Sequence, residues 1–145
     1  MIQEIEVLLI EDNLSDVEMI TRALKKNNLA NGLVHVKDGN EALDFLFGQG
    51  KYLGRQIKNI PKVILLDLKM PKVNGKECLL RLKMNVRTKK IPIVVLSSSK
   101  EDSDINECYD LGANGYVVKP VEFDDLQKAI SDLGSYWLML NEPPQ

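Results

Sequence analysis

The chain has 145 residues, which suits one domain with a real core, and its 19 basic and 21 acidic residues leave a net charge of -2. This balance excludes the global basic field that would point to nucleic acid or an anionic membrane as a partner. Two cysteines, Cys78 and Cys108, form no CxxC or Cys/His metal pattern, so we expect reduced, buried thiols in a cytoplasmic protein. We expect no signal peptide, and no apolar run approaches the roughly 20 residues of a membrane span.

Regular structure is predicted to begin with an all-aliphatic segment, residues 7–10, that ends at Glu11 and Asp12. Four unbroken aliphatic positions are typical of a strand that is buried on both faces of a parallel sheet. A helix follows, and Ser15 with Glu18 three residues later predicts a capping box at its start.

A second strand and helix are predicted over residues 33–36 and about 39–47, because turn residues precede each of them. The segment from Gly48 to Pro61 then interrupts the alternation with glycines and cations, which indicates a long mobile connection. Loops of this length are often functional. The simpler interpretation is a solvated insertion without a partner, because exposed loops accept added length at little free-energy cost.

The third predicted strand, residues 63–66, is again all aliphatic and ends at Asp67. Its carboxylate is therefore expected at the carboxyl end of a central strand, which is where open α/β sheets place their chemistry. A helix is predicted from about Lys76 to Met84, and the basic run after it, residues 87–90, is interpreted as a solvated loop.

The remaining elements alternate in the same way. They are predicted as a strand over 91–96, a helix over about 102–111, a strand over 115–120 and a last helix from about 122 that Pro143-Pro144 closes. Ser97 directly follows the fourth strand, and Lys119 lies at the end of the fifth. Five βα units predict an α/β fold with a doubly wound parallel sheet. We expect one domain over 1–145, with a core of about 4–134 and a C-terminal helical extension and tail over 135–145.

Side chains at four strand ends are expected to share one pocket, because the carboxyl ends of parallel strands meet at the same edge of the sheet. They are Glu11, Asp12, Asp67, Ser97 and Lys119. Three crowded carboxylates repel one another, and a hard divalent cation, best Mg²⁺, relieves that repulsion. A free oxygen of Asp67 could then attack phosphorus, and the metal, the Lys119 ammonium and the Ser97 hydroxyl would bind the phosphoryl oxygens.

Each of these signals has a simpler explanation when it is taken alone. An acid at a strand end is usually a turn or helix cap, a terminal serine usually caps the next helix, and a lysine before proline is usually solvated. Their coincidence at four strand ends favours a site.

Several motifs together resemble the receiver domain of two-component response regulators, and the resemblance covers nearly the whole chain. They are Leu8–Asp12, Asp38–Leu43, Leu66–Pro71 with Asn74-Gly75, Val95–Ser97 and Gly112–Pro120. The intervals from Asp67 to Ser97 and from Ser97 to Lys119 also look like those of the family. The resemblance implies a flavodoxin-like sheet of order 2-1-3-4-5 and a histidine kinase as phosphate donor.

The same resemblance implies roles for individual residues. Asp67 would be the phosphoacceptor, and Mg²⁺ would be bound by Glu11, Asp12, Asp67 and the carbonyl of Lys69. Lys119 and Ser97 would bind the phosphoryl group. The resemblance also suggests that the Lys119-Pro120 bond is cis, as tertiary amides permit.

A conformational switch is a further implication of the resemblance. The Ser97 hydroxyl, drawn toward the phosphoryl group, would be coupled to the rotamer of Tyr116, and the surface of the fourth helix, fifth strand and fifth helix would report the change. A half-buried strand residue is the simpler interpretation of Tyr116. Lys69 and Ser99, two residues beyond Asp67 and Ser97, occupy positions that tune the access of water to the acyl phosphate.

A narrower similarity concerns the long connection, the glutamate at Glu11 and the tail from Ser135 to Gln145. These features look like the single-domain regulators that serve cyanobacterial and other bacterial phytochromes, which implies a phytochrome as the kinase. The apolar run from Trp137 to Leu140 predicts a contact with a second protomer or a kinase. A homodimer could use the tail or the surface of the fourth helix, fifth strand and fifth helix, whereas extra cover for the domain's own core is the alternative.

Two other functions fit the same architecture. An aspartyl phosphatase usually has a second acid two residues after the nucleophile, where this chain has Lys69. A flavin or nucleotide carrier would bind phosphate after the first strand, where Glu11 and Asp12 would repel it unless metal intervened. The expected function is a phosphorylation-controlled binding module without a DNA-binding or enzymatic output.

Overall fold

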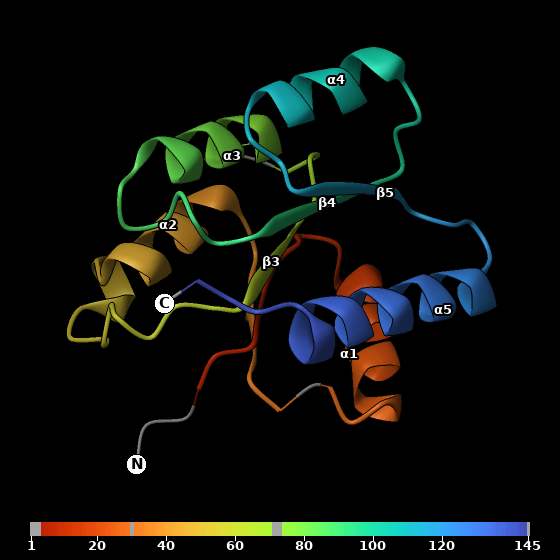
Figure 1. Cartoon of the computed structure of the whole chain (residues 1–145), viewed down its shortest axis with the longest axis horizontal. Helices are drawn as coiled ribbons and strands as arrows, with labels where there is room; N and C mark the ends of the chain where they lie inside the picture. Colours follow the sequence, from red (N-terminus) through yellow and green to blue (C-terminus); the bar gives the residue numbers. More distant parts are fainter. Residues whose placement is uncertain (1–3, 30, 71–73, 145) are drawn as a thin grey trace.

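Five parallel strands form one sheet in the order β2-β1-β3-β4-β5 (Figure 1). The computed structural model describes residues 4–29, 31–70 and 74–144. The strands are β1 (Val7–Ile10), β2 (Leu33–Val36), β3 (Val63–Leu66), β4 (Ile93–Ser97) and β5 (Gly115–Val118). The predicted doubly wound, flavodoxin-like sheet is confirmed.

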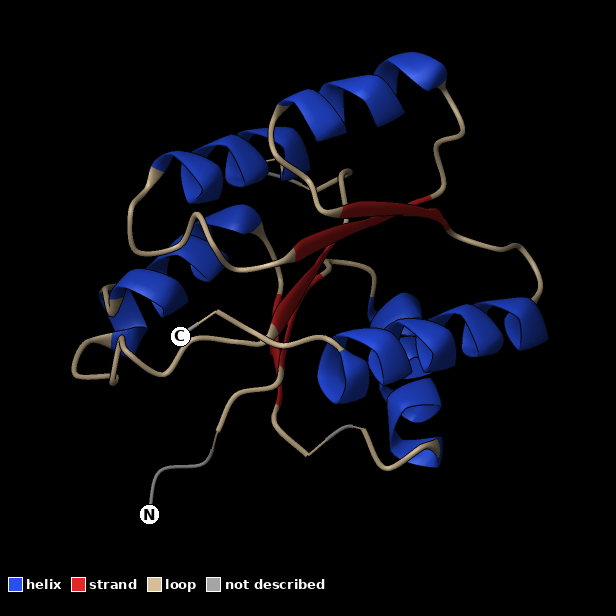
Figure 2. Cartoon of the chain, viewed as in Figure 1, coloured by secondary structure: helices blue, strands red, loops and turns tan. Residues whose placement is uncertain are grey.

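Helices cover both faces of this sheet (Figures 1 and 2). They are α1 (Leu14–Lys26), α2 (Gly39–Phe47), α3 (Gly75–Met84), α4 (Asp102–Asp110) and α5 (Phe123–Gly134). Alternate residues of β1 point to opposite faces: Leu8 and Ile10 join the core under α2, α3 and α4, whereas Val7 and Leu9 join the core under α1 and α5. This two-sided burial explains why the strands carry no polar face.

Some element boundaries differ from those predicted. β4 begins at Ile93 rather than Ile91, because Pro92 has no N–H to donate to the sheet. The predicted capping box of α1 is wrong: Asn13 caps the helix, and its side chain accepts a hydrogen bond from the Asp16 N–H at 3.1 Å. Asparagine is among the best residues for this position, so the helix begins one residue before Ser15.

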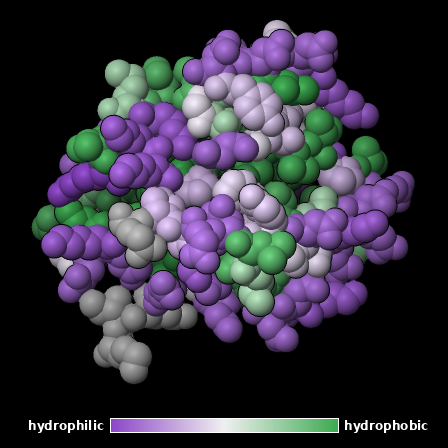
Figure 3. All heavy atoms as spheres, in the orientation of Figure 1, coloured by the Kyte–Doolittle hydropathy of each residue, from purple (hydrophilic) through white to green (hydrophobic). Residues whose placement is uncertain are grey.

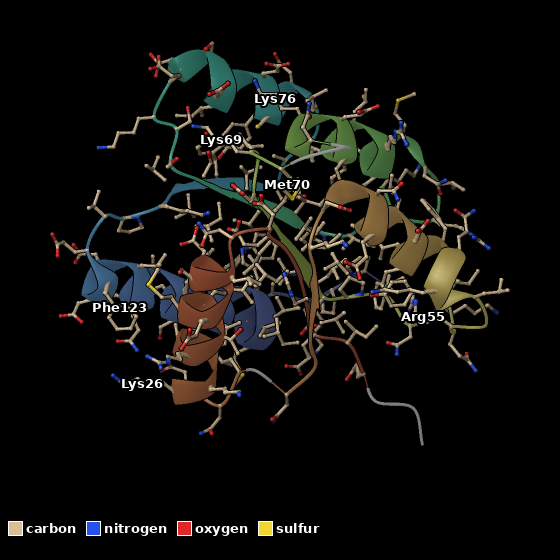
Figure 4. All side chains as sticks on the ribbon, turned by 180° about the vertical axis from the view of Figure 1, so that it is seen from behind. Lys26, Arg55, Lys69, Met70, Lys76 and Phe123 are labelled. Atoms are coloured by element: carbon tan, nitrogen blue, oxygen red, sulfur yellow. The ribbon has the colours of Figure 1, made fainter. Side chains whose placement is uncertain are left out.

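The long connection after α2 is folded against that helix rather than extended into solvent. It contains a 3-10 helix, η1 (Gly50–Tyr52), whose Tyr52 hydroxyl donates to Glu41 at 2.7 Å. Lys51 forms an ion pair with the same carboxylate, also at 2.7 Å. Arg55 donates from Nε to the Phe45 carbonyl at 2.6 Å, and it lies at the far end of the molecule from Lys69 and Met70 in Figure 4.

The C-terminal segment continues α5 as a π-helical turn, η2 (Ser135–Leu140). Leu138 is buried and Trp137 packs against the core under α1 and α5, so half of the apolar run covers the domain itself. Met139 and Leu140 remain about three-quarters exposed. Green apolar atoms also lie between the polar residues over the face shown in Figure 3. None of the described helices is long and apolar enough to cross a membrane.

Candidate functional site

Asp67 is held at the carboxyl end of β3 by its own backbone and by a close approach of α3. Its N–H donates to the Ile10 carbonyl at 3.0 Å, and its side chain is largely buried. Gly75, at the start of α3, lies so close that a Cβ there would be 2.5 Å from both the Asp67 carbonyl oxygen and the Leu68 Cα. Only glycine allows this approach, which accounts for the Asn74-Gly75 motif.

Three carboxylates meet beside this strand end. Glu11 and Asp12 follow β1, the neighbour of β3 in the sheet, and an oxygen from each lies within 4.8 Å of an oxygen of Asp67. Glu11 is almost fully buried and Asp12 is exposed. The predicted acid cluster is therefore confirmed. Its donors are all hard carboxylate oxygens, and one of them faces solvent, which suits a Mg²⁺ ion that keeps several waters.

Burial is the main reason why the pKa of Glu11 is raised from 4.5 to about 7. A hydrogen bond to Lys119 lowers this pKa, and the nearby Asp67 raises it further. Ionising the buried Glu11 beside Asp67 is therefore unfavourable even with the Lys119 ammonium in contact, and a divalent ion would relieve the repulsion between the two carboxylates.

Lys119 reaches into the pocket from the end of β5. Its ammonium lies 2.7 Å from Glu11 Oε1 and 2.8 Å from Asp16 Oδ2, and 3.7 Å from Asp67 Oδ1. Burial is the largest single effect on the Lys119 pKa and lowers it. The contacts with Asp16, Glu11 and Asp67 together outweigh burial and raise the pKa to about 12. The lysine therefore stays charged beside the acid cluster.

Ser97 and Tyr116 lie on neighbouring strands and meet at the backbone of Ser99. The Ser99 N–H donates to Ser97 Oγ at 3.1 Å, and the Tyr116 hydroxyl donates to the Ser99 carbonyl at 2.9 Å. The Ser99 hydroxyl donates to Asp104 at 2.5 Å, and Asp104 is bound in turn by Lys76 at 2.7 Å. A chain of polar contacts thus connects the site to α4 and α3.

The structure also shows two features that the sequence predictions missed. Asp16 binds Lys119, and its only sequence signal was an acid in the first turn of a helix, where helices commonly place one. Lys76 joins Asp104 to Glu107, at 2.7 and 2.8 Å, across α3 and α4. Pairs this far apart in the sequence leave no local pattern.

Two remaining predictions concern the backbone near the site. The expected cis bond between Lys119 and Pro120 is wrong: no peptide bond in the described parts of the chain is cis. The trans form is favoured intrinsically even before proline. The carbonyl of Lys69 belongs to the loop after Asp67, and Figure 4 shows Lys69 and Met70 at this edge of the sheet, with Lys76 nearby. Residues 71–73 of that motif lie outside the described residues.

The chain is similar to known proteins in both sequence and fold. A family model described as the response regulator receiver domain matches residues 7–131. Response regulator Rcp1 of Synechocystis sp. is 36% identical over 132 residues, which are 91% of this chain and 88% of that protein. A crystal structure of Rcp1 in its Mn²⁺-bound form has a TM-score of 0.88 at 35% identity and covers 96% of this chain and 98% of its own.

Two other solved structures are similar over almost their whole length. The phosphorylated cyanobacterial phytochrome response regulator RcpA has a TM-score of 0.90 at 34% identity, covering 98% of this chain and 99% of that chain. The bacteriophytochrome response regulator AtBRR is 48% identical with a TM-score of 0.75, covering 97% and 100%.

Proposed function

Because this chain belongs to the response regulator receiver domain family, a class of signalling module, we propose that it accepts a phosphoryl group from a histidine kinase on Asp67. The observation that carries this proposal is the meeting of Glu11, Asp12 and Asp67 within 4.8 Å, with the Lys119 ammonium 3.7 Å from Asp67. Phosphorylation then changes the surface formed by α4, β5 and α5, through which partners bind.

The chemistry follows from the side chains in the pocket. The carboxylates of Glu11, Asp12 and Asp67 and the carbonyl of Lys69 would hold Mg²⁺, which when bound neutralises charge on the incoming phosphoryl oxygens. An oxygen of Asp67 forms the bond to phosphorus as the bond to the donor breaks. Lys119 and Ser97 then donate hydrogen bonds to phosphoryl oxygens, and the partial burial of the site strengthens these charged contacts.

The switch and the lifetime of the acyl phosphate depend on the serine and tyrosine contacts. When the Ser97 hydroxyl turns to donate to the phosphoryl group, the geometry of the hydrogen bond that Ser97 Oγ accepts from the Ser99 N–H changes. The Tyr116 hydroxyl is bound to the Ser99 carbonyl, so its rotamer is coupled to that movement. Lys69 and Ser99, at the mouth of the pocket, tune the access of water and so the rate of dephosphorylation.

The similar response regulators support a proposal for the partners. RcpA is named a cyanobacterial phytochrome response regulator and AtBRR a bacteriophytochrome response regulator, which supports a phytochrome as the kinase of this chain. We also propose that the protein acts in the cytoplasm and binds neither nucleic acid nor membrane. A homodimer forms through the surface of α4, β5 and α5 or through the tail, where Met139 and Leu140 are exposed. Truncation after Gly134 should weaken self-association in analytical ultracentrifugation, and unchanged sedimentation would contradict a tail-mediated dimer.

Labelling with acetyl phosphate tests the central proposal. The protein is incubated with acetyl phosphate and Mg²⁺, and its intact mass is measured for the wild type, for Asp67→Asn and for Asp110→Asn as a control at an exposed acid on α4. We expect one phosphoryl adduct in the wild type and in the control, none in Asp67→Asn, and none after Mg²⁺ is chelated. An adduct that persists in Asp67→Asn, or rapid turnover of unrelated phosphate esters, would contradict the proposal and favour a phosphatase.

A further inference from the structure

Asp16 is a fourth carboxylate at this site, and it does not belong to the acid cluster. It lies in the first turn of α1, where its N–H donates to the side chain of the cap residue Asn13 at 3.1 Å. Its Oδ2 accepts from the Lys119 ammonium at 2.8 Å. The lysine side chain is 13% exposed and that of Asp16 is 23% exposed, so water screens this contact less than it screens a surface pair.

The distances around the ammonium show how its three N–H donors are used. Glu11 at 2.7 Å and Asp16 at 2.8 Å are both in hydrogen-bond range. Asp67 at 3.7 Å is too distant for a hydrogen bond, although it is close enough for attraction between the charges. Two of the three donors are thus used in hydrogen bonds to Glu11 and Asp16, and Asp67 lies beyond hydrogen-bond distance of the ammonium.

Without Asp16, only Glu11 would hold the ammonium by a hydrogen bond, and Glu11 itself lies in the acid cluster beside Asp67. A lysine side chain is flexible, so the ammonium could close onto Asp67 and form a direct hydrogen bond with it. Such a contact would occupy the carboxylate oxygen that attacks phosphorus, and it would also fill the space that a phosphoryl oxygen needs.

We propose that Asp16 is a positioning residue, which holds the Lys119 ammonium out of direct contact with Asp67 and ready to receive a phosphoryl oxygen. This inference rests on the proposed function, because it concerns the same transfer. In that step an oxygen of Asp67 forms a bond to phosphorus, the phosphorus–oxygen bond of acetyl phosphate breaks, and acetate leaves with the electron pair.

The rate of labelling by acetyl phosphate at saturating Mg²⁺ tests the inference. In Asp16→Asn we expect the maximal rate to fall about fivefold, the scale of losing one partly buried charged contact. In Asp16→Glu, which keeps the charge, we expect at least half of the wild-type rate. Glu18→Gln is the matched control, because Glu18 lies on the same helix but forms an exposed pair with Arg22, and its rate should stay unchanged.

The direction of the change in labelling rate distinguishes a positioning role of Asp16 from a general effect of its negative charge. Removing a carboxylate near the pocket would by itself favour an anionic phosphodonor and raise the rate. A rate in Asp16→Asn that is unchanged or faster, or no recovery in Asp16→Glu, would therefore overturn the inference. Circular dichroism checks folding, and Asp16→Ser, which also suits a first helical turn, takes the place of Asp16→Asn if that variant does not fold.

A second measurement does not depend on phosphorylation. In ¹³C NMR of the aspartate carboxylates, we expect the Asp67 signal to stay at its wild-type position in Glu18→Gln and to move in Asp16→Asn, where the Lys119 ammonium would form a direct hydrogen bond with the Asp67 carboxylate. If the wild type forms no adduct but this pattern is seen, the proposed function fails while the contact holds. An Asp67 signal that keeps its wild-type position in Asp16→Asn overturns the positioning role.

Discussion

Replacing Glu11 with glutamine should change how the stability of the metal-free protein depends on pH. The folded protein keeps the Glu11 proton up to a pKa of about 7, whereas the unfolded chain loses it near 4.5. The unfolded state therefore binds fewer protons across this window, and the free energy of unfolding falls as the pH rises from about 4.5 to about 7. At about 1.4 kcal/mol per pH unit, the loss amounts to about 3 kcal/mol, and it is complete above pH 7.

Glutamine preserves the size of the side chain and an oxygen for the Lys119 ammonium, but it cannot ionise. Urea unfolding in the presence of a chelator, at half-unit steps from pH 5 to pH 8, should show this fall in the wild type and in the exposed-acid variant Glu18→Gln. In Glu11→Gln the fall should largely disappear. A wild-type stability that is constant or increases over this range would refute the reasoning, as would a Glu11→Gln variant with the wild-type slope.

Three further changes test other parts of the molecule. Gly75→Ala should lower the free energy of unfolding in urea by about 1–3 kcal/mol and slow labelling, because the new Cβ would meet the backbone of Asp67 and Leu68. Gly115→Ala is the control and should cost less, because its Cβ would meet only the Val94 side chain, at 3.6 Å or more. Equal losses in the two variants would contradict this reasoning. Lys69→Ala should change the decay rate of the acyl phosphate without abolishing labelling, and an unchanged decay would argue against a role in tuning. Glu41→Gln should speed hydrogen exchange of the backbone amides of residues 50–55 but not of β3, because Lys51 and Tyr52 lose the carboxylate that they share. If these amides are protected equally in the variant and in the wild type, other contacts hold the connection.

The mouth of the pocket and the partner surface are linked by the contacts around Ser99. Its carbonyl, N–H and hydroxyl bind four different residues, and two of these, Glu101 and Asp104, lie at the start of α4. A cavity of about 520 Å³ between α3 and α4 is lined in part by Lys69, Ser97 and Ser99, so the loop between β4 and α4 has room to rearrange. If Asp67 is phosphorylated as proposed, these contacts are the route by which the change would reach α4.

The buried strands, and the edge of the sheet where the site lies, could be predicted from local features of the sequence. The aliphatic runs of β1, β3 and β4 mark strands that are buried on both faces, and parallel strands align their carboxyl ends, so Asp67 and the acids after β1 had to lie at the same edge. Both signals are local, because they depend only on the residues of each strand and on the residue that follows it.

How the charges at that edge are paired became visible only in the folded domain. Lys119 is bound by Glu11 and Asp16 rather than directly by Asp67, and these partners are 108 and 103 residues away in the sequence. Whether an ammonium lies 2.8 or 3.7 Å from a carboxylate depends on the placement of α1 against β5, to which distant parts of the chain contribute. Coulombic and hydrogen-bond energies change steeply over that distance, so the pairing emerges only when the whole domain is packed.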